Sequence, residues 1–139
     1  MTTYDTVFAL NVVEHIKDDR QALINIRKLL RKNGRCIILV PAYQCLYNGF
    51  DEELNHYRRY TSETLTSALR DAGFRLFKEQ YFNAMGIPGW YFSGTIGKNK
   101  TIPKGQISLY NAMVPAFRLI DKLLFNKVGL SVIGVGIKD

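Results

Sequence analysis

Residues 5–13 read DTVFALNVV, a β-branched and aromatic run that is apolar at almost every position. Such a run is typical of a strand that is buried on both faces, as in a parallel sheet. A second apolar run covers residues 35–40 and stops at Pro41. Between the two runs, apolar residues from Ala22 to Leu30 recur at three- and four-residue steps, which predicts an amphipathic helix. Strand, helix and strand over about 35 residues is the size of a βαβ unit, so the two strands are predicted to be parallel.

The ends of this first helix carry their own signals. Asp18 or Asp19 suits the N-cap position, and the basic last turn complements the negative end of the helix dipole. The pair Asn33-Gly34 is predicted to end the helix, with Gly34 as the left-handed residue.

The middle of the chain is less regular. Residues 41–60 are polar, aromatic and rich in turn formers, which predicts a long loop that is functional or flexible. A short helix follows, capped by Thr61 or Ser62 and closed by Gly73. Residues 74–82 then have the pattern of a third strand.

An insertion of about residues 83–128 is predicted before the last strand. Its first part is rich in glycine, aromatic residues and lysine, and from about Ser108 to Phe125 it predicts a helix that Pro115 either kinks or begins. Residues 129–138 form the fourth predicted strand, in a hairpin-like antiparallel pair with the third. The fold class is therefore α/β.

Length and composition limit the class of protein. The chain has 139 residues, of which 47% are hydrophobic and 22% charged, which fits one domain and excludes a disordered tail, a collagen-like fibre and a coiled-coil rod. The sequence has no run of 18 apolar residues and no signal peptide at its start, so a cytoplasmic location is expected. The formal charge of +7 favours anionic partners. Cys36 lies within the second apolar run and is expected to be a buried thiol.

The first strand raises a question of pairing. An exposed edge strand is normally short, charged or interrupted by proline, and residues 6–13 have none of these features. The sequence shows only one evident neighbour, at residues 35–40. Either an antiparallel strand of this chain covers the free side, or the covering strand comes from elsewhere. We favour the second interpretation, in which the chain is a fragment of a larger domain or an oligomer that borrows strands.

Several stretches, in their order and spacing, resemble class I S-adenosylmethionine-dependent methyltransferases. They are YDTVF at 4–8, NVVEHI at 11–16, LLRKNGR at 29–35, DEELNHYRRYT at 51–61, AGF at 72–74 and GLSVI at 129–133. The resemblance implies a single domain over 1–139 that is the C-terminal half of a Rossmann-like methyltransferase sheet. The N-terminal strands that bind the cofactor, with their glycine-rich loop, would lie upstream, and this chain would supply one wall of the ligand crevice. The protein would then be active with a partner, or an inactive truncation.

Both histidines fall just beyond the carboxyl ends of the predicted parallel strands, where open α/β sheets bind ligands. We therefore expect His15 and His56, with Glu14, to be catalytic. In methyl transfer the sulfonium carries the activation, so the protein mainly orients the acceptor and removes its proton, for which an imidazole is a suitable base.

The resemblance also suggests binding residues. It implies that the segment Leu10, Asn11 and Val12 contacts S-adenosylmethionine, while Arg58 and Arg59 are candidates for holding an anionic substrate. Simpler interpretations exist, because the first segment could pack the sheet and the arginines could be solvated. The expected acceptor is a small or lipid-linked molecule.

A metal site is an alternative for the same cluster. Some small-RNA 2′-O-methyltransferases have a Glu-x-x-Glu-His motif and a later histidine that bind a metal. Here Asn11 replaces the first glutamate, which leaves Glu14, His15 and His56. No metal is expected.

Two further alternatives concern partners. Residues 90–92 (WYF) stand near several lysines, a mixture more typical of a lid or packed loop than of a membrane surface, and no nucleic-acid partner is expected. The rival function is a non-enzymatic interaction module that self-associates, as a homo-oligomer, through its exposed first strand.

Overall fold

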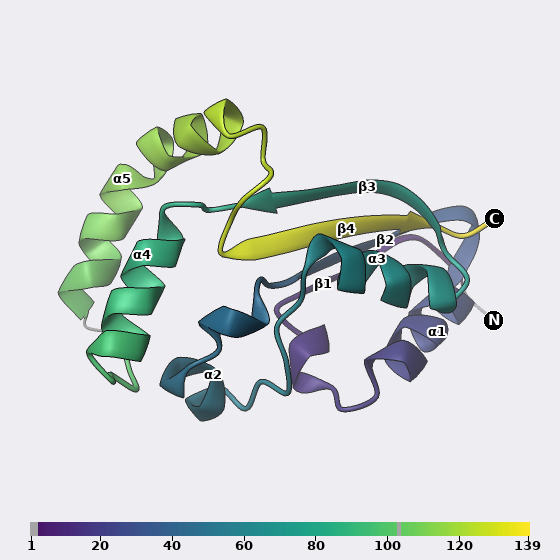
Figure 1. Ribbon diagram of the computed structural model, residues 1–139. Coiled ribbons are helices and arrows are strands. Elements are labelled where there is room, and N and C mark those ends of the chain that lie inside the picture. Colours follow the sequence, from purple (N-terminus) through teal and green to yellow (C-terminus); the bar gives the residue numbers. More distant parts are fainter. Residues whose placement is uncertain (1–2, 103) are drawn as a thin grey trace.

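A computed structural model describes residues 3–102 and 104–139 (Figure 1). Its elements, in chain order, are β1 (Tyr4–Leu10), the 3-10 turn η1 (Val13–His15), α1 (Asp19–Leu29), β2 (Leu30–Pro41), the 3-10 turn η2 (Gln44–Leu46), α2 (Gly49–Glu53), α3 (Ser62–Asp71), β3 (Arg75–Phe82), α4 (Gly86–Trp90), the π-helical turn η3 (Tyr91–Ile96), α5 (Lys104–Leu123) and β4 (Ser131–Ile137).

The four strands form one sheet in the order β1-β2-β4-β3. β1 pairs with β2 in parallel, which confirms the predicted βαβ unit. β4 is antiparallel to both of its neighbours, so the antiparallel pairing of the last two strands is also confirmed. That β4 lies between β2 and β3 was not predicted. The α/β fold class is correct, with parallel and antiparallel strands in one sheet.

The core lies between the sheet and the helices α1 and α3, which pack on one face (Figure 1). Leu23 of α1 and Leu69 of α3 are fully buried there, against Cys36 and Ile38 of β2. Two predicted caps are confirmed, because the side chain of Asp18 accepts from Gln21 N at 2.9 Å and Thr61 begins α3.

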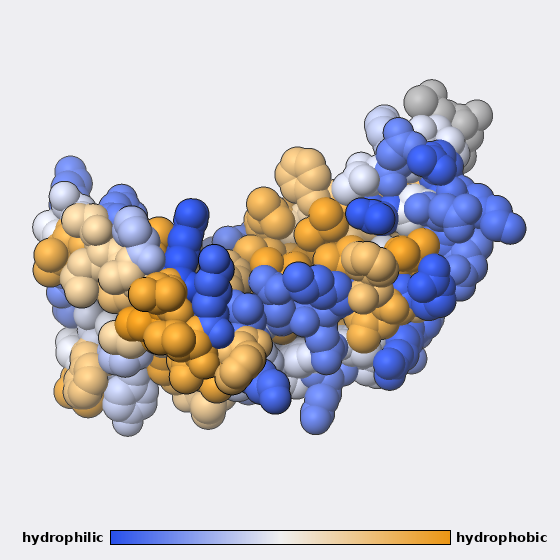
Figure 2. All heavy atoms as spheres, turned by 90° about the horizontal axis from the view of Figure 1, so that it is seen from above, coloured by the Kyte–Doolittle hydropathy of each residue, from blue (hydrophilic) through white to orange (hydrophobic). Residues whose placement is uncertain are grey.

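The other face of the sheet is more open. On β1, Phe8 is 67% exposed and Leu10 49%, and Phe77 of β3 is 54% exposed. Figure 2 looks onto this side of the molecule and shows hydrophobic side chains gathered over the sheet. Among the described strands, β1 has a partner on one side only. The interpretation in which a strand of this chain covers the outer side of β1 is therefore wrong for the part of the chain that the structure describes.

Three local predictions need correction. The left-handed residue after α1 is Asn33, with φ 62°, and not Gly34, because β2 already begins at Leu30 and continues through the turn. The segment 41–60 is not a plain loop, since it contains η2 and α2. The final helix begins at Lys104, and Pro115 lies inside it.

Residues 83–128, the predicted insertion, form a helical extension made of α4, η3 and α5. It lies beyond the end of the sheet at which β1, β2 and β3 finish (Figure 1). Asp121 of α5 ties it to that end, because its buried carboxylate accepts from the backbone N–H groups of Asn83 (2.6 Å) and Ala84 (2.9 Å). The hydroxyl of Tyr110 also donates to the side-chain oxygen of Asn83.

Candidate functional site

Two segments that follow neighbouring parallel strands meet at the carboxyl end of the sheet. After β1 the chain turns at Asn11, with φ 53°, into η1, which carries Glu14 and His15. After β2 the chain runs through η2 and α2 to His56. The segments are joined where the N–H of Tyr57 donates to the backbone oxygen of Glu14 at 2.8 Å. One ligand atom each of Glu14, His15 and His56 lies within 4.8 Å of the others.

Asp51 is the buried centre of this polar cluster. Its residue is 0% exposed, and one carboxylate oxygen lies 2.7 Å from His56 Nδ1. The other oxygen accepts from the N–H of Asn48 at 3.1 Å, while Asn48 caps α2 in return. This capping box holds the Asp51 carboxylate in place at the start of α2, and the carboxylate in turn orients the imidazole of His56.

Arg59 closes the cluster from the side of the helical extension. Its Nη1 donates to Leu46 O at 3.0 Å and lies 3.5 Å from Asp51, and its guanidinium lies 4.9 Å from the centre of the Trp90 ring. Burial lowers the pKa of Arg59, and the Asp51 charge opposes that shift. The arginine is therefore a buried partner of Asp51 and of an aromatic ring in this structure.

Glu14 is fully buried without a hydrogen bond to its carboxylate oxygens from the described residues. Burial raises its pKa above the ordinary value of 4.5. The His15 imidazole lies beside it, with Nε2 4.0 Å from Glu14 Oε1. The His15 ring meets the His56 ring edge-on, with centroids 4.7 Å apart. The side chain of His15 is 38% exposed and that of His56 8%, so His15 stands on the solvent side of the pair.

The predicted binding residues lie in two different settings. Arg58 donates to the backbone oxygens of Ile16 (2.9 Å) and Lys17 (2.7 Å), so its guanidinium holds the segment after η1. Substrate binding by Arg58 and Arg59 stays a prediction. Leu10 and Val12, by contrast, are 49% and 46% exposed beside an exposed Asn11. This segment fits one apolar wall of a cofactor site, with one amide to hydrogen-bond.

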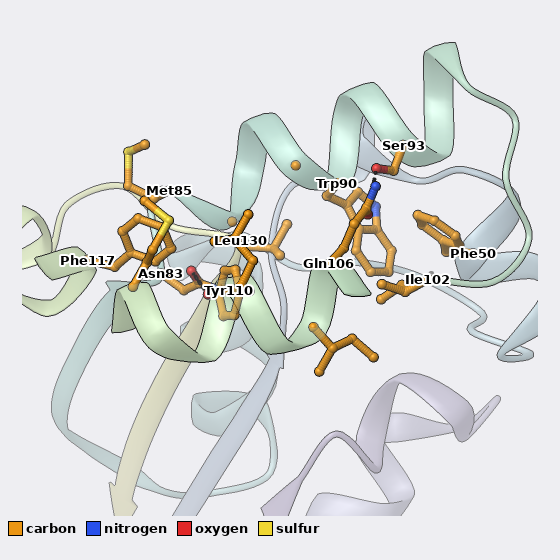
Figure 3. A pocket seen from close by; sticks show the side chains of 15 residues that line it. Phe50, Asn83, Met85, Trp90, Ser93, Ile102, Gln106, Tyr110, Phe117 and Leu130 are labelled. Atoms are coloured by element: carbon orange, nitrogen blue, oxygen red, sulfur yellow. Dashed lines mark hydrogen bonds between the residues drawn. The ribbon is translucent and has the colours of Figure 1, made fainter. Parts of the chain in front are cut away.

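A cavity of about 460 Å³ lies next to the polar cluster, between α5 and the helices α4 and η3 (Figure 3). It is lined by Phe50, Asn83, Met85, Gly86, Gly89, Trp90, Ser93, Ile102, Gln106, Ile107, Leu109, Tyr110, Met113, Phe117 and Leu130. In Figure 3, Phe117, Met85 and Tyr110 stand at one end, and Trp90 and Phe50 at the other. Most of the lining is apolar, so the cavity suits a hydrocarbon chain or ring system.

The cavity and the cluster share two elements. On α2, Phe50 lines the cavity, while the next residue, Asp51, contacts His56. Trp90 also lines the cavity, and the Arg59 guanidinium lies over its ring. The Nε1 of Trp90 donates to Leu46 O at 3.0 Å. A molecule with its apolar part in the cavity would therefore lie beside the polar cluster.

The structure brings together His15, His56 and Glu14, which the sequence predicted as site residues, whereas no role was predicted for Asp51 and no cavity was expected. The Asn48-to-Asp51 spacing of a capping box was the available signal for the former. The cavity has no signal of its own in the sequence, because the side chains of α5 become a cavity wall only where α4 lies opposite them.

Comparisons with known proteins find a family for the chain and solved structures with a similar fold. A family described as "Methyltransferase domain" matches residues 1–79. No curated protein matches the chain.

Among solved structures, a SAM-dependent methyltransferase from Thermotoga maritima is similar to the chain, with 16% identity and a TM-score of 0.60 over 99% of this chain and 57% of that one. A SAM-dependent methyltransferase from Archaeoglobus fulgidus has 21% identity and a TM-score of 0.53, with coverage of 99% and 60%. Phosphoethanolamine N-methyltransferase 2 of Haemonchus contortus, in complex with S-adenosyl-L-methionine, has 14% identity and a TM-score of 0.54, with coverage of 97% and 33%. The chain thus spans about half the length, or less, of these structures.

Proposed function

Because the chain belongs to the class I S-adenosylmethionine-dependent methyltransferase family, we propose that it takes part in methyl transfer to a hydroxyl or amine of a small or lipid-linked acceptor. The observation that carries this proposal is the buried Asp51–His56 hydrogen bond of 2.7 Å beside His15. It lies at the carboxyl end of parallel strands, where open α/β sheets bind ligands.

His56 is the proposed base. A carboxylate only accepts hydrogen bonds, so Asp51 favours the tautomer with the proton on His56 Nδ1. The lone pair on Nε2 is then free to accept the proton of the acceptor. Asp51 acts as a positioning residue, and the more exposed His15 borders the place where an acceptor head group would lie. When bound, S-adenosylmethionine supplies an electrophilic methyl group, and Leu10, Asn11 and Val12 would contact it.

The apolar cavity supports a lipid-linked acceptor over a small polar one. Its walls offer a few hydrogen-bonding groups, among them Tyr110 and Gln106, within a mainly hydrocarbon surface. An acceptor with an isoprenoid or acyl chain could place that chain there and its polar head beside His56. A small polar acceptor would leave the cavity unused.

The test uses the full chain with radiolabelled S-adenosylmethionine and two acceptor mixtures, a lipid extract and a water-soluble metabolite extract. We expect label in the lipid fraction, and a rate about 10²–10⁴ lower in His56→Asn. Tyr57→Phe, at an exposed neighbour, is the matched control and should keep the rate. Isothermal titration measures cofactor binding separately. Absence of both cofactor binding and label transfer would overturn the proposal.

A self-associating module is the second candidate, favoured by the exposed side chains of β1. Phe8→Lys places a charge on the open face of the sheet next to the unpaired edge of β1, and Phe77→Lys is its control on β3 at the far edge of the sheet. If the module interpretation is correct, light scattering after gel filtration should show an oligomer that only the Phe8 variant dissociates. A monomeric parent chain excludes this candidate.

A further inference from the structure

Helix α5 leaves many of its large apolar side chains exposed to solvent. One stripe of the helix is turned inward, in which Tyr110, Val114 and Phe117 are partly buried and Asp121 is buried. Four large apolar side chains outside this stripe are open to solvent, namely Leu109 66%, Met113 44%, Leu119 60% and Leu123 68%. The first two also stand at the rim of the cavity.

These exposed residues form a continuous arc. At 100° per residue, Leu109, Met113, Leu119 and Leu123 fall within an arc of about 120° that also holds Ala112 and Ala116 and contains no charged residue. The basic residues Lys104, Arg118 and Lys122 fall on the remaining exposed side of the helix. We call the first surface the apolar arc of α5. Phe125, just after the helix, adds a side chain that is 80% exposed.

The charges of the helical extension are almost all positive. Residues 83–128 contain six basic side chains and one acidic side chain, Asp121, so their formal net charge is +5, against +7 for the whole chain. Asp121 is buried, and its carboxylate accepts hydrogen bonds from two backbone N–H groups. The extension therefore presents cations and hydrocarbon to solvent without an exposed carboxylate, and Figure 2 shows both kinds of surface on this part of the molecule.

From this combination we infer that the helical extension docks on an anionic lipid bilayer, with the apolar arc of α5 in the acyl–headgroup boundary and its basic side against the headgroups. A helix with an uncharged apolar face and a basic polar face binds membranes in this orientation. Of the described helices, none is both long and apolar enough to cross a membrane. The helix would lie in the interface plane.

Charge decides between a bilayer and a second copy of the chain. Two copies that met through α5 would bring two uniformly cationic extensions together, and like-charge juxtaposition opposes such a contact. An anionic surface attracts the same side chains. The cavity between α4 and α5 would then open next to the bilayer, where a lipid chain is available. The inference itself does not depend on methyl transfer, because membrane binding is measured without cofactor.

The test is vesicle co-sedimentation of the full chain, with phosphatidylcholine vesicles compared with vesicles that also contain phosphatidylglycerol. We expect binding to the anionic vesicles that weakens with added salt. The double variant Leu109→Glu, Leu123→Glu should lower the partition coefficient about tenfold or more. Lys104→Glu and Lys122→Glu should each lower it at least about fivefold, because each removes one positive charge and adds a negative one.

Matched controls place the same changes elsewhere on the surface. Leu54→Glu replaces a leucine of similar exposure on the α2 side, and Lys28→Glu reverses an exposed charge on α1. Both should bind vesicles like the parent chain. As an independent readout, Phe125→Trp in a Trp90→Phe background should show a blue-shifted emission on anionic vesicles. Circular dichroism verifies that each variant is folded.

Three outcomes would overturn the inference: a parent chain that does not bind anionic vesicles, vesicle binding that the α5 variants leave unchanged, or α5 variants that dissociate an oligomer without altering vesicle binding. The last outcome would assign the apolar arc to a contact between copies.

Discussion

Removal of the Asp51 charge is expected to destabilise the protein more than any neighbouring change. In Asp51→Asn the side chain keeps its shape, but the guanidinium of Arg59, whose side chain is 1% exposed, loses the carboxylate 3.5 Å away. Leaving one partner of a buried ion pair uncompensated costs about 3–5 kcal/mol. That is a large share of a typical stability of about 5–15 kcal/mol.

Urea unfolding followed by circular dichroism measures this loss as a change in the free energy of unfolding. Glu52→Gln, the next residue along the same helix and exposed, is the matched control and should stay within about 0.5 kcal/mol of the parent chain. The double variant Asp51→Asn, Arg59→Met should recover much of the loss, because no buried charge then lacks a partner. A loss below about 1 kcal/mol in Asp51→Asn, or a double variant no more stable than the single one, would refute the reasoning.

Four further predictions concern single groups. Burial raises the pKa of the Cys36 thiol to about 12, whereas Cys45 is exposed, so Ellman's reagent at pH 8 should titrate one thiol in the native chain, two in urea and none in native Cys45→Ser. Asp121→Ala leaves two backbone N–H groups without their acceptor, which should cost about 2–3 kcal/mol and speed proteolysis within residues 83–128; unchanged cleavage would contradict this. Since burial raises the pKa of Glu14, the folded state holds that proton more tightly than the unfolded state. The stabilisation that comes from the raised pKa of Glu14 is therefore fully present below about pH 4.5 and is lost as the pH rises through the folded pKa, by at most about 1.4 kcal/mol per pH unit. Glu14→Gln should remove this part of the pH dependence of the free energy of unfolding, and Glu52→Gln should retain it. Protein purified without a histidine tag is expected to hold no stoichiometric metal, because burial disfavours the charged carboxylate form of Glu14 that a metal ligand needs. One equivalent of zinc that disappears in Glu14→Gln would show the opposite.

The sequence predicted those parts of the fold that depend on residues close to one another along the chain. The apolar runs of β1 and β2, the intervening amphipathic helix and the caps at Asp18 and Thr61 all depend on residues close in sequence. The place of β4 between β2 and β3 depends on distant pairing, and nothing in residues 129–138 specifies which strands become its neighbours.

The candidate site divides in the same way. His15 and Glu14 follow directly from the end of β1, so their position at the carboxyl edge was predictable. Asp51 was missed because α2 has only five residues and leaves no periodic pattern, although the capping residue Asn48 was visible. The cavity was beyond sequence reasoning, since its walls come from α2, α4, η3, α5 and the residue before β4, which meet only in the folded chain.

The route of the chain into β4 has a thermodynamic consequence for any molecule that enters the cavity. Leu130 lines the cavity, its N–H donates to Asn83 O at 3.1 Å, and its own oxygen accepts from the N–H of Ala42 at 2.8 Å, at the end of β2. One residue therefore connects the cavity wall to the middle of the sheet. A ligand in the cavity will therefore raise the melting temperature of the entire protein and not only stiffen two peripheral helices. Thermal-shift screening can then detect cavity ligands before any methyl acceptor has been identified.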